Sequence, residues 1–170
     1  ALGQPRAPRV RFRPHGDYHL GQVLVTEGDI MILAFEGEPS RSLVERRAKS
    51  SPLRDVAGML QSFAYAALTG LGAATLTRPD DVERLAPWAQ LWENWVARTF
   101  LQAYVSATRH ASFLPSSSEH LEEMLSAFVL DKALYELGYE LNNRPDWVHI
   151  PLACLLRPRT AFRLRTALPA

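Results

Sequence analysis

The sequence predicts an α+β fold that is mainly α-helical. Two short apolar runs, residues 23–25 and 30–33, flank a turn that contains a glycine and are typical of a β-hairpin. From residue 51 onward, apolar residues recur at the spacing of amphipathic helices. With 170 residues and 47% hydrophobic content, the chain can form one domain with a sizeable core. We therefore expect a hairpin attached to a helical body.

All of the β-structure is expected in the first part of the chain. Residues 10–12 indicate a short β stretch, and the Pro-x-Gly-Asp sequence at residues 14–17 predicts a loop before the hairpin. The turn of the hairpin falls at residues 27–29. Residues 35–51 are polar and include a basic cluster at residues 46–49. We interpret this segment as an irregular loop across a surface or a site.

The remainder predicts four helical segments. Ser51 is a suitable N-cap and Pro52 fits the first helical position, while Gly70 and Gly72 are expected to break this helix. An Asn-Asn-Arg-Pro sequence is a strong stop signal after the third helix. The later helical segments are predicted at residues 85–107, 119–141 and 148–156.

The composition excludes several classes of protein. Nineteen Lys and Arg against 18 Asp and Glu give a net charge of +1, which favours neither nucleic acid nor anionic membranes. The single cysteine, Cys154, cannot form an internal disulfide and lacks the Cys and His array of a zinc site. No apolar run approaches the length of a membrane span, and the N-terminus lacks the apolar stretch of a signal peptide. We expect a cytoplasmic protein with small-molecule or protein partners.

The segment before the hairpin carries the residues best suited to catalysis. It reads His-Gly-Asp-Tyr-His-Leu-Gly-Gln and places Asp17 and Gln22 five residues apart on a loop that leads into a strand. In phosphoryl transfer, an Asp takes the proton of the acceptor hydroxyl, and an amide oxygen nearby can coordinate magnesium. The alternative is that Asp17 and His19 only satisfy backbone groups in a tight turn.

This segment resembles the catalytic loop of aminoglycoside-phosphotransferase-like kinases, whose pattern is His-Gly-Asp-x-His-x-x-Asn followed by a hairpin. Gln22, and the Phe-Glu-Gly-Glu-Pro sequence at residues 35–39, resemble the maltokinases of that family. Two later blocks, residues 45–60 and 132–145, resemble the same proteins. The resemblance implies a protein-kinase-like C-terminal lobe over residues 15–157, after an extended segment (1–14) and before a tail (158–170).

The resemblance also implies an activity and its participants. A maltokinase transfers the γ-phosphoryl group of ATP to maltose and forms maltose 1-phosphate, in trehalose and glycogen metabolism. By this resemblance Asp17 would be the catalytic base and Gln22 a ligand of Mg²⁺, with His15 and His19 supporting the loop. Maltokinases also occur fused to trehalose synthase, so such a fusion is one expected partner, beside maltose or a related sugar.

Two departures from the family pattern bear on activity. Ala34 stands where these kinases carry a metal-binding Asp, and a methyl group cannot coordinate a cation. Glu36 could substitute for it in part, or could be a solvated loop residue or an ion-pair partner of the basic cluster. The sequence also holds no N-terminal lobe with a phosphate-binding lysine. We therefore expect a fragment that is inactive alone and self-associates through uncovered apolar surface.

Two alternatives to the maltokinase assignment remain open. One is a pseudokinase-like module without catalysis that binds a sugar or docks a partner, which Ala34 favours. The other is a kinase of the same fold with an amino-alcohol acceptor, against which Gln22 and residues 35–39 argue.

Several other residues are candidates with a structural alternative. Asp55 lies near a predicted helix N-terminus and is expected to accept backbone hydrogen bonds from the catalytic loop, or simply to favour the helix dipole. Glu136 and Tyr139 are proposed as maltose contacts, the alternative being a solvated glutamate and a core tyrosine.

The three tryptophans on one face of the second helix are expected to pack in the core rather than to stack on sugars, namely Trp88, Trp92 and Trp95. The remaining histidines, His110, His120 and His149, show no ligand spacing.

Overall fold

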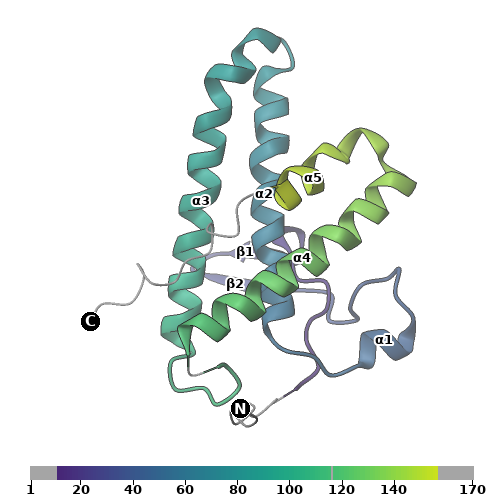
Figure 1. The fold of residues 1–170 in the computed structure, drawn as a ribbon, viewed down its shortest axis with the longest axis vertical. Coiled ribbons are helices and arrows are strands. Elements are labelled where there is room, and N and C mark those ends of the chain that lie inside the picture. The colour runs from purple at the N-terminus through teal and green to yellow at the C-terminus, as the bar shows by residue number, and fades with distance from the viewer. Residues whose placement is uncertain (1–10, 116, 157–170) are drawn as a thin grey trace, which may run out of the picture.

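The computed structural model describes residues 11–115 and 117–156 (Figure 1). Most of the predicted N-terminal segment and the whole predicted tail lie outside these residues. The elements follow the chain in this order: η1 (Leu20–Gln22), β1 (Val23–Thr26), β2 (Asp29–Ile32), α1 (Leu43–Arg47), α2 (Leu53–Thr75), η2 (Pro79–Asp81), α3 (Val82–Ala107), α4 (Ser118–Asn143), η3 (Pro145–Trp147) and α5 (His149–Leu156). The mainly helical α+β class is as predicted.

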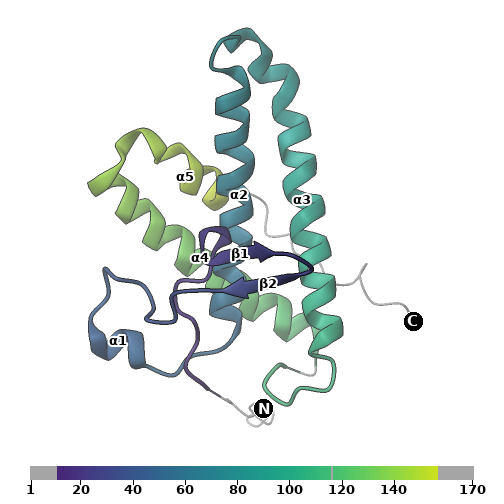
Figure 2. The same ribbon diagram turned by 180° about the vertical axis from the view of Figure 1, so that it is seen from behind.

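Helix α2 is the centre of the helical body. Figures 1 and 2 show it between α3 on one side and α4 with α5 on the other, and it contacts all three. Its buried side chains recur at helical spacing and include Leu53, Val56, Leu60 and Phe63. By length and composition α2 could cross a membrane, contrary to the expectation for this sequence, but half of its apolar window is buried in the body. Packing as a core helix accounts for that apolar character.

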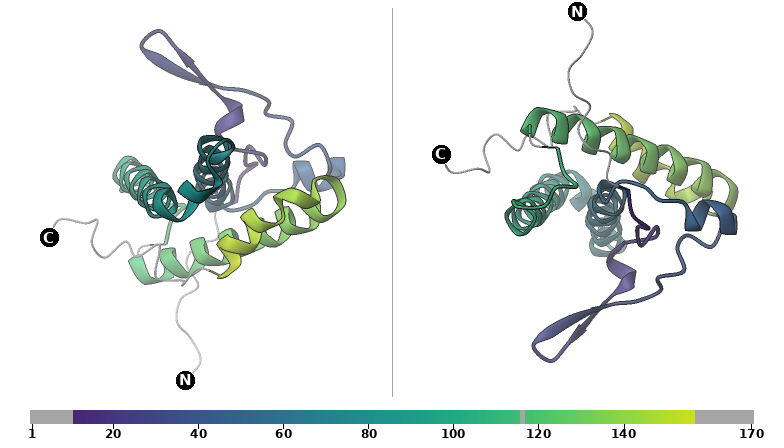
Figure 3. Two further views of the ribbon diagram at one scale, coloured as in Figure 1. Left: turned by 90° about the horizontal axis from the view of Figure 1, so that it is seen from above. Right: turned by 90° about the horizontal axis from the view of Figure 1, so that it is seen from below.

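The predicted hairpin is confirmed. Strands β1 and β2 are antiparallel, with Val23 opposite Ile32, and Gly28 in the turn has a φ of 85°, which glycine adopts without strain. The hairpin projects away from the helical body (Figure 3). Apolar side chains on both strands, Val25 and Ile30 among them, are therefore exposed.

The segment predicted to be an irregular loop contains a short helix, α1. Ser42 caps it: the Ser42 hydroxyl accepts the backbone N–H of Glu45, and the Glu45 carboxylate accepts the backbone N–H of Ser42 at 2.9 Å. This reciprocal pair is a capping box. The loop prediction was wrong here because the Ser-x-x-Glu signal stands in a strongly polar stretch. At the end of the segment, Ser50 pairs with Phe12 in an isolated β-bridge, consistent with the β stretch expected there.

The predicted break at Gly70 and Gly72 is wrong, since α2 continues to Thr75. A glycine costs a helix about 1 kcal/mol relative to alanine, and packing of α2 against α3 outweighs that cost. The hydroxyl of Thr75 also donates to the carbonyl of Leu71 at 2.9 Å, so it adds to the last turn. The three later helices are present as predicted, with limits shifted by up to three residues.

The tryptophans of α3 are not in the core. Trp88, Trp92 and Trp95 are 68%, 46% and 71% exposed, and Leu91 beside them is 54% exposed. The core side of α3 is formed instead by residues such as Ala97 and Leu101. The expectation that the tryptophans pack inside is therefore wrong, because amphipathic spacing alone does not reveal which apolar face of a helix is covered.

Candidate active site

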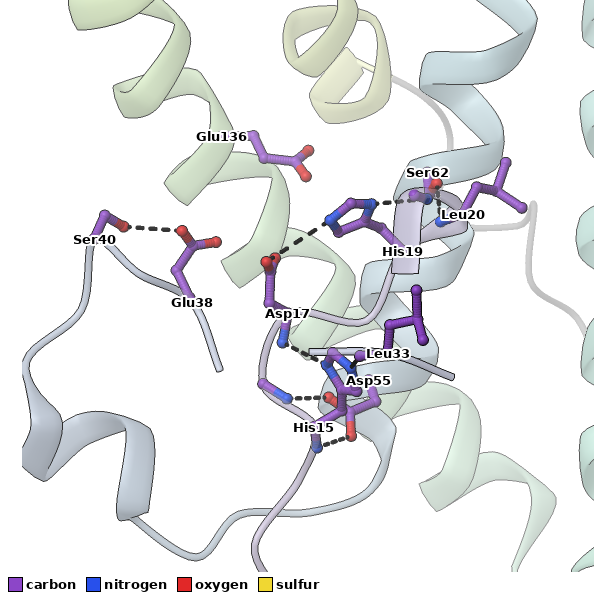
Figure 4. Close-up of polar contacts among 12 residues, drawn as sticks. His15, Asp17, His19, Leu20, Leu33, Glu38, Ser40, Asp55, Ser62 and Glu136 are labelled. Carbon is purple, nitrogen blue, oxygen red and sulfur yellow. Dashed lines mark hydrogen bonds and ion pairs between the residues drawn. The ribbon is translucent and has the colours of Figure 1, made fainter. Parts of the chain in front are cut away.

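The predicted catalytic loop lies along one face of α2. The carboxylate of Asp55 accepts the backbone N–H of His15 at 2.7 Å and that of Gly16 at 2.8 Å. About two turns further along α2, the hydroxyl of Ser62 accepts the backbone N–H of Leu20 at 2.9 Å (Figure 4). The contacts expected of Asp55 are thus present, and the loop is held at two points.

Between these two points, Gly58 allows the loop backbone to touch α2. A Cβ atom at this position would lie 2.6 Å from the backbone carbonyl oxygen of Tyr18. That distance is shorter than any tolerable contact, so the close approach requires glycine. The close contact between the loop and α2 therefore depends on the absence of a Cβ atom at position 58.

His15 joins the loop to the end of the hairpin. Its ring is buried beside Tyr18 and Phe35. The Nε2 atom donates to the carbonyl oxygen of Leu33 at 2.6 Å, and Nδ1 accepts the backbone N–H of Asp17 at 3.3 Å. An imidazole in which one ring nitrogen donates a hydrogen bond and the other accepts one is neutral. His15 is therefore a positioning residue for Asp17.

Asp17 presents its carboxylate to a cavity. The side chain is 14% exposed, and one carboxylate oxygen lies 3.7 Å from Nε2 of His19. Burial acts to raise the pKa of Asp17, but hydrogen bonding and charge from His19, together with the charge of Lys132, outweigh it and hold the pKa below its usual value. Asp17 is therefore ionised at neutral pH, as a base must be.

The cavity lies between the loop, α2 and α4 and has a volume of about 320 Å³, within the range of small-molecule sites. Figure 4 shows Asp17, His19, Glu38 and Glu136 around this space. Its lining is Asp17, His19, Glu38, Gly58, Ser62, Tyr65, Lys132, Tyr135, Glu136, Tyr139, Glu140 and Arg144. Most of these side chains can form hydrogen bonds, which suits a ligand rich in hydroxyl groups.

Glu136 has one carboxylate oxygen without a partner. Its Oε1 atom lies 3.2 Å from the Lys132 ammonium group, whereas Oε2 is buried with no hydrogen bond among the described residues. Burial raises the pKa of Glu136, and the charge of Lys132 counteracts part of that effect. A buried acceptor without a donor costs free energy, so Oε2 is suited to bind a donor group of a ligand.

Glu140, one turn further along α4, has both carboxylate oxygens hydrogen-bonded within the protein. Its carboxylate is 1% exposed and accepts the Tyr65 hydroxyl at 2.9 Å. The guanidinium of Arg144 donates to both carboxylate oxygens, at 2.9 and 2.6 Å. Burial and then the charges of Glu136 and Glu140 raise the pKa of Tyr65, so its hydroxyl stays a donor. This network fixes one wall of the cavity and leaves no oxygen of Glu140 for a ligand.

A second wall comes from the segment after the hairpin. The Ser40 hydroxyl bonds with the Tyr135 hydroxyl, and the guanidinium of Arg41 lies 4.7 Å from the centre of the Tyr135 ring. These contacts hold the segment against α4. Glu38, which accepts the Ser40 hydroxyl at 3.2 Å, is thereby placed at the cavity beside Asp17.

The expected magnesium site does not fit the residues present. The backbone carbonyl oxygen of Gln22 accepts the backbone N–H of Leu33 at 2.9 Å, which places Gln22 near Ala34 in the chain. A neutral amide and a methyl group are a poor donor set for Mg²⁺, which prefers carboxylates. Over residues 11–115 and 117–156, no group of three His, Cys, Asp or Glu side chains could hold a metal ion.

Ala34 nevertheless has an unusual backbone. Its φ of 58° is left-handed, and no other non-glycine residue in the described part of the chain has a positive φ. For a residue with a Cβ atom this conformation costs about 1–2 kcal/mol, and Asp and Asn adopt it more often than Ala. Position 34 therefore has a backbone conformation that is more common for Asp than for Ala, although its side chain is a methyl group.

Of the site residues predicted from sequence, four lie at one cavity: Asp17, His19, Glu136 and Tyr139. His15 and Asp55 hold the loop from outside it, and Gln22 is not part of the lining. The lining residues that were not predicted as site residues are Glu38, Gly58, Ser62, Tyr65, Lys132, Tyr135, Glu140 and Arg144. Ser62 could have been found, because it lies seven residues after Asp55 and so on the same face of α2.

The chain is similar to glucosamine kinases. It is 35% identical over 147 residues to the glucosamine kinase of Mycolicibacterium smegmatis, an alignment that covers 83% of this chain and 33% of the relative. The glucosamine kinase of Streptacidiphilus jiangxiensis is 28% identical over 137 residues, which cover 81% and 29% of the two chains. No protein-family model matches the chain.

Solved structures of glucosamine kinase have the same fold in the matching region. One in complex with glucosamine, ADP and inorganic phosphate gives a TM-score of 0.64 at 27% identity and covers 83% of this chain and 33% of that one. A second crystal form gives a TM-score of 0.67 at 26% identity, with coverage of 94% and 36%. The chain thus spans about a third of the length of the relatives it matches. The matches are to sugar kinases, and neither maltokinase nor trehalose synthase is among these relatives.

Proposed function

We propose that this chain is the acceptor-binding part of a sugar kinase, and that its acceptor is an amino sugar of the glucosamine type. The observation that carries the proposal is the pairing, in one cavity, of an ionised Asp17 with the unpartnered buried Oε2 atom of Glu136. Asp17 would accept the proton of the reacting hydroxyl, and Glu136 would accept a hydrogen bond from a donor elsewhere on the sugar.

The chemistry assigned to Asp17 is that of a general base. As the sugar hydroxyl oxygen bonds to the γ-phosphorus of ATP, the carboxylate accepts the hydroxyl proton, the bond from phosphorus to the bridging oxygen breaks, and ADP leaves. The hydrogen bonds of Asp55 and His15 to the loop hold Asp17 in place for this step. Such a loop contributes through orientation, because it loses little freedom when the substrate binds.

Glu136 favours an amino sugar over a neutral one. A carboxylate forms a stronger hydrogen bond with an ammonium group than with a hydroxyl. The carboxylates in the lining outnumber its two cations, Lys132 and Arg144. The solved complex of a similar kinase with glucosamine, ADP and inorganic phosphate supports this choice. Maltose, expected from the resemblance of Gln22 and residues 35–39 to maltokinases, is the competing acceptor.

Isothermal titration of the chain with glucosamine, glucose and maltose tests the acceptor. We expect glucosamine to bind more tightly than glucose, which differs from it at the amine, and more tightly than maltose. Glu136→Gln should weaken glucosamine binding roughly tenfold to a hundredfold, as expected for a hydrogen bond to a charged group. Glu123→Gln, the same change at an exposed position of α4, is the matched control. Tighter binding of maltose than glucosamine would contradict the proposal.

A second candidate function is a sugar-binding module without catalysis. Ala34 favours it, because the position lacks the carboxylate that a cation would need next to the nucleotide phosphates. Sugar-dependent release of ADP from ATP, measured with the chain as it is, separates the two functions. Any sugar phosphate formed by the purified chain would exclude the second candidate, whereas sugar binding without turnover would favour it.

A further inference from the structure

The exposed tryptophans of α3 form an apolar stripe that no part of the described body covers. We define the tryptophan stripe as Trp88, Leu91, Trp92 and Trp95. These residues recur every three or four positions, so they share one face of the helix. The opposite face of α3 packs on α2 through Ala97 and Leu101.

The stripe is remote from the candidate active site. The cavity lies between the loop, α2 and α4. Helix α3 lies on the side of α2 that is opposite to α1 (Figures 1 and 3). A nucleotide has to approach Asp17 from the cavity side. A sugar or nucleotide bound next to Asp17 would therefore not contact the stripe.

We propose that the tryptophan stripe is the interface of a homodimer, in which two copies of α3 pack antiparallel about a two-fold axis between Leu91 and Trp92. A two-fold interface places the same patch of both copies in contact, and a stripe along a single helix satisfies this requirement when the two helices are antiparallel. In this register Trp88 of each copy lies against Trp95 of the other, and Trp92 lies next to the axis. Offset ring contacts between such pairs add to the burial of area.

The area of the stripe agrees with a second copy as its occupant. An aromatic side chain carries roughly 150–250 Å² of surface, so the exposed portions of the stripe amount to about 500 Å². Two copies face to face would bury about 1,000 Å² in total, which reaches the lower limit of specific interfaces. On the same side of α3, Arg84 precedes the stripe and Arg98 follows it. Arg84 is paired with Asp81 at 3.0 Å, which offsets its charge between copies.

Sedimentation equilibrium of the whole chain tests the interface. We expect a dimer that dissociates on dilution, and we expect Trp88→Ser with Trp95→Ser to raise its dissociation constant more than about tenfold, because tryptophans dominate interface energies. The control is Val25→Ser with Ile30→Ser, which removes exposed apolar side chains from the hairpin and should leave the dimer intact. Unchanged circular dichroism and thermal unfolding would show that both variants fold.

Three results would overturn the proposal. The first is a wild-type chain that stays monomeric at every concentration. The second is a dimer that the hairpin variant abolishes and the tryptophan variant keeps, which would assign the interface to β1 and β2. The third is a monomer whose tryptophan fluorescence changes on adding maltoheptaose, which would make the stripe a polysaccharide surface.

The antiparallel register has its own test. In a chain with Cys154→Ser, a cysteine introduced by Trp92→Cys lies next to the two-fold axis and should form a disulfide between copies on mild oxidation. A cysteine introduced by Arg84→Cys should not, because antiparallel packing places it opposite Thr99. Cross-linking of both variants would indicate parallel helices and overturn the proposed register.

Discussion

The carboxylate of Asp55 accepts the backbone N–H of His15 at 2.7 Å, across forty residues of sequence. The same carboxylate also accepts the N–H of Gly16, so one side chain satisfies two successive donors at the start of the candidate catalytic loop. A helix residue thereby fixes the backbone from which Asp17 extends. The position of Asp17 therefore depends on α2 as well as on the loop itself.

Removal of that carboxylate should loosen the loop. We expect Asp55→Ala to lower the free energy of unfolding by about 1–3 kcal/mol, because two partly buried N–H groups lose their acceptor. Asp55→Asn keeps one acceptor oxygen and should show a smaller loss. Urea unfolding measures both, and equal stability of Asp55→Ala and the wild type would show that the loop finds other acceptors.

Replacement of Gly58 should displace the loop from α2. The Cβ atom of Gly58→Ala would lie 2.6 Å from the carbonyl oxygen of Tyr18. Both segments are backbone, so neither can move away without a cost in free energy. We expect a loss of about 1–3 kcal/mol of stability and weaker binding of glucosamine, measured by urea unfolding and isothermal titration.

Gly70→Ala is the matched control, since it makes the same change in the same helix. A Cβ at Gly70 meets no atom within 4 Å. This variant should gain up to about 1 kcal/mol of stability from helix propensity. A similar change in stability for the two variants would contradict the argument for close approach at Gly58.

The network around Glu140 should be strongly coupled. Glu140→Ala leaves the buried Tyr65 hydroxyl and the Arg144 guanidinium without their acceptor, and we expect it to cost about 3–5 kcal/mol of stability. Tyr65→Phe removes only one hydrogen bond and should cost about 0.5–1.5 kcal/mol. A double-mutant cycle of these variants, measured by thermal unfolding, should be non-additive. Additive effects would mean that the two side chains act independently.

Local signals predicted much of the fold. The hairpin followed from two β-branched runs around a Gly turn, and the end of α4 followed from Asn-Asn-Arg-Pro, because both depend on residues close in sequence. The break at Gly70 failed because helix propensity is weak beside tertiary packing. The tryptophan stripe was misplaced for a related reason, because a periodic apolar face does not tell whether the neighbouring helices of the chain cover it.

The site was predictable only in part. Asp17 followed from the loop motif, and Glu136 with Tyr139 followed from helical spacing, and all three line the cavity. Lys132 and Glu38 were missed because their places depend on how α4 and the segment after the hairpin meet. Contacts between distant segments leave no periodic signal in a single sequence.

The left-handed backbone at Ala34 should be measurable as strain. Ala34→Gly should raise the free energy of unfolding by about 1 kcal/mol, since glycine adopts a positive φ without the Cβ clash. Ala103→Gly, on the exposed side of α3, makes the same substitution in a helix and should instead lower stability by about 0.5–1 kcal/mol. Opposite signs in urea unfolding would support the strained conformation, and two losses would argue against it.

Glucosamine binding should depend on pH through Glu136. An ammonium group binds the carboxylate and not the neutral acid, so affinity falls as the pH drops through the pKa of Glu136. Because burial raises that pKa, the fall should begin at a higher pH than for an exposed glutamate, whose pKa is about 4.3. The groups that face Glu136 are Lys132, which lowers the pKa mainly through its charge, Gln61, whose nearby side-chain amide also lowers it, and Glu140, which raises it through its charge.

Titration calorimetry across the acidic range, where the amine of glucosamine stays protonated, measures this dependence. In Glu136→Gln the affinity should be lower at neutral pH and nearly flat through the interval in which the wild type falls. The pKa of Asp17 is held below its usual value, so Asp17 remains ionised through that interval and does not produce the fall. An unchanged profile in Glu136→Gln would assign the pH dependence to another carboxylate of the cavity, with Glu38 the next to substitute.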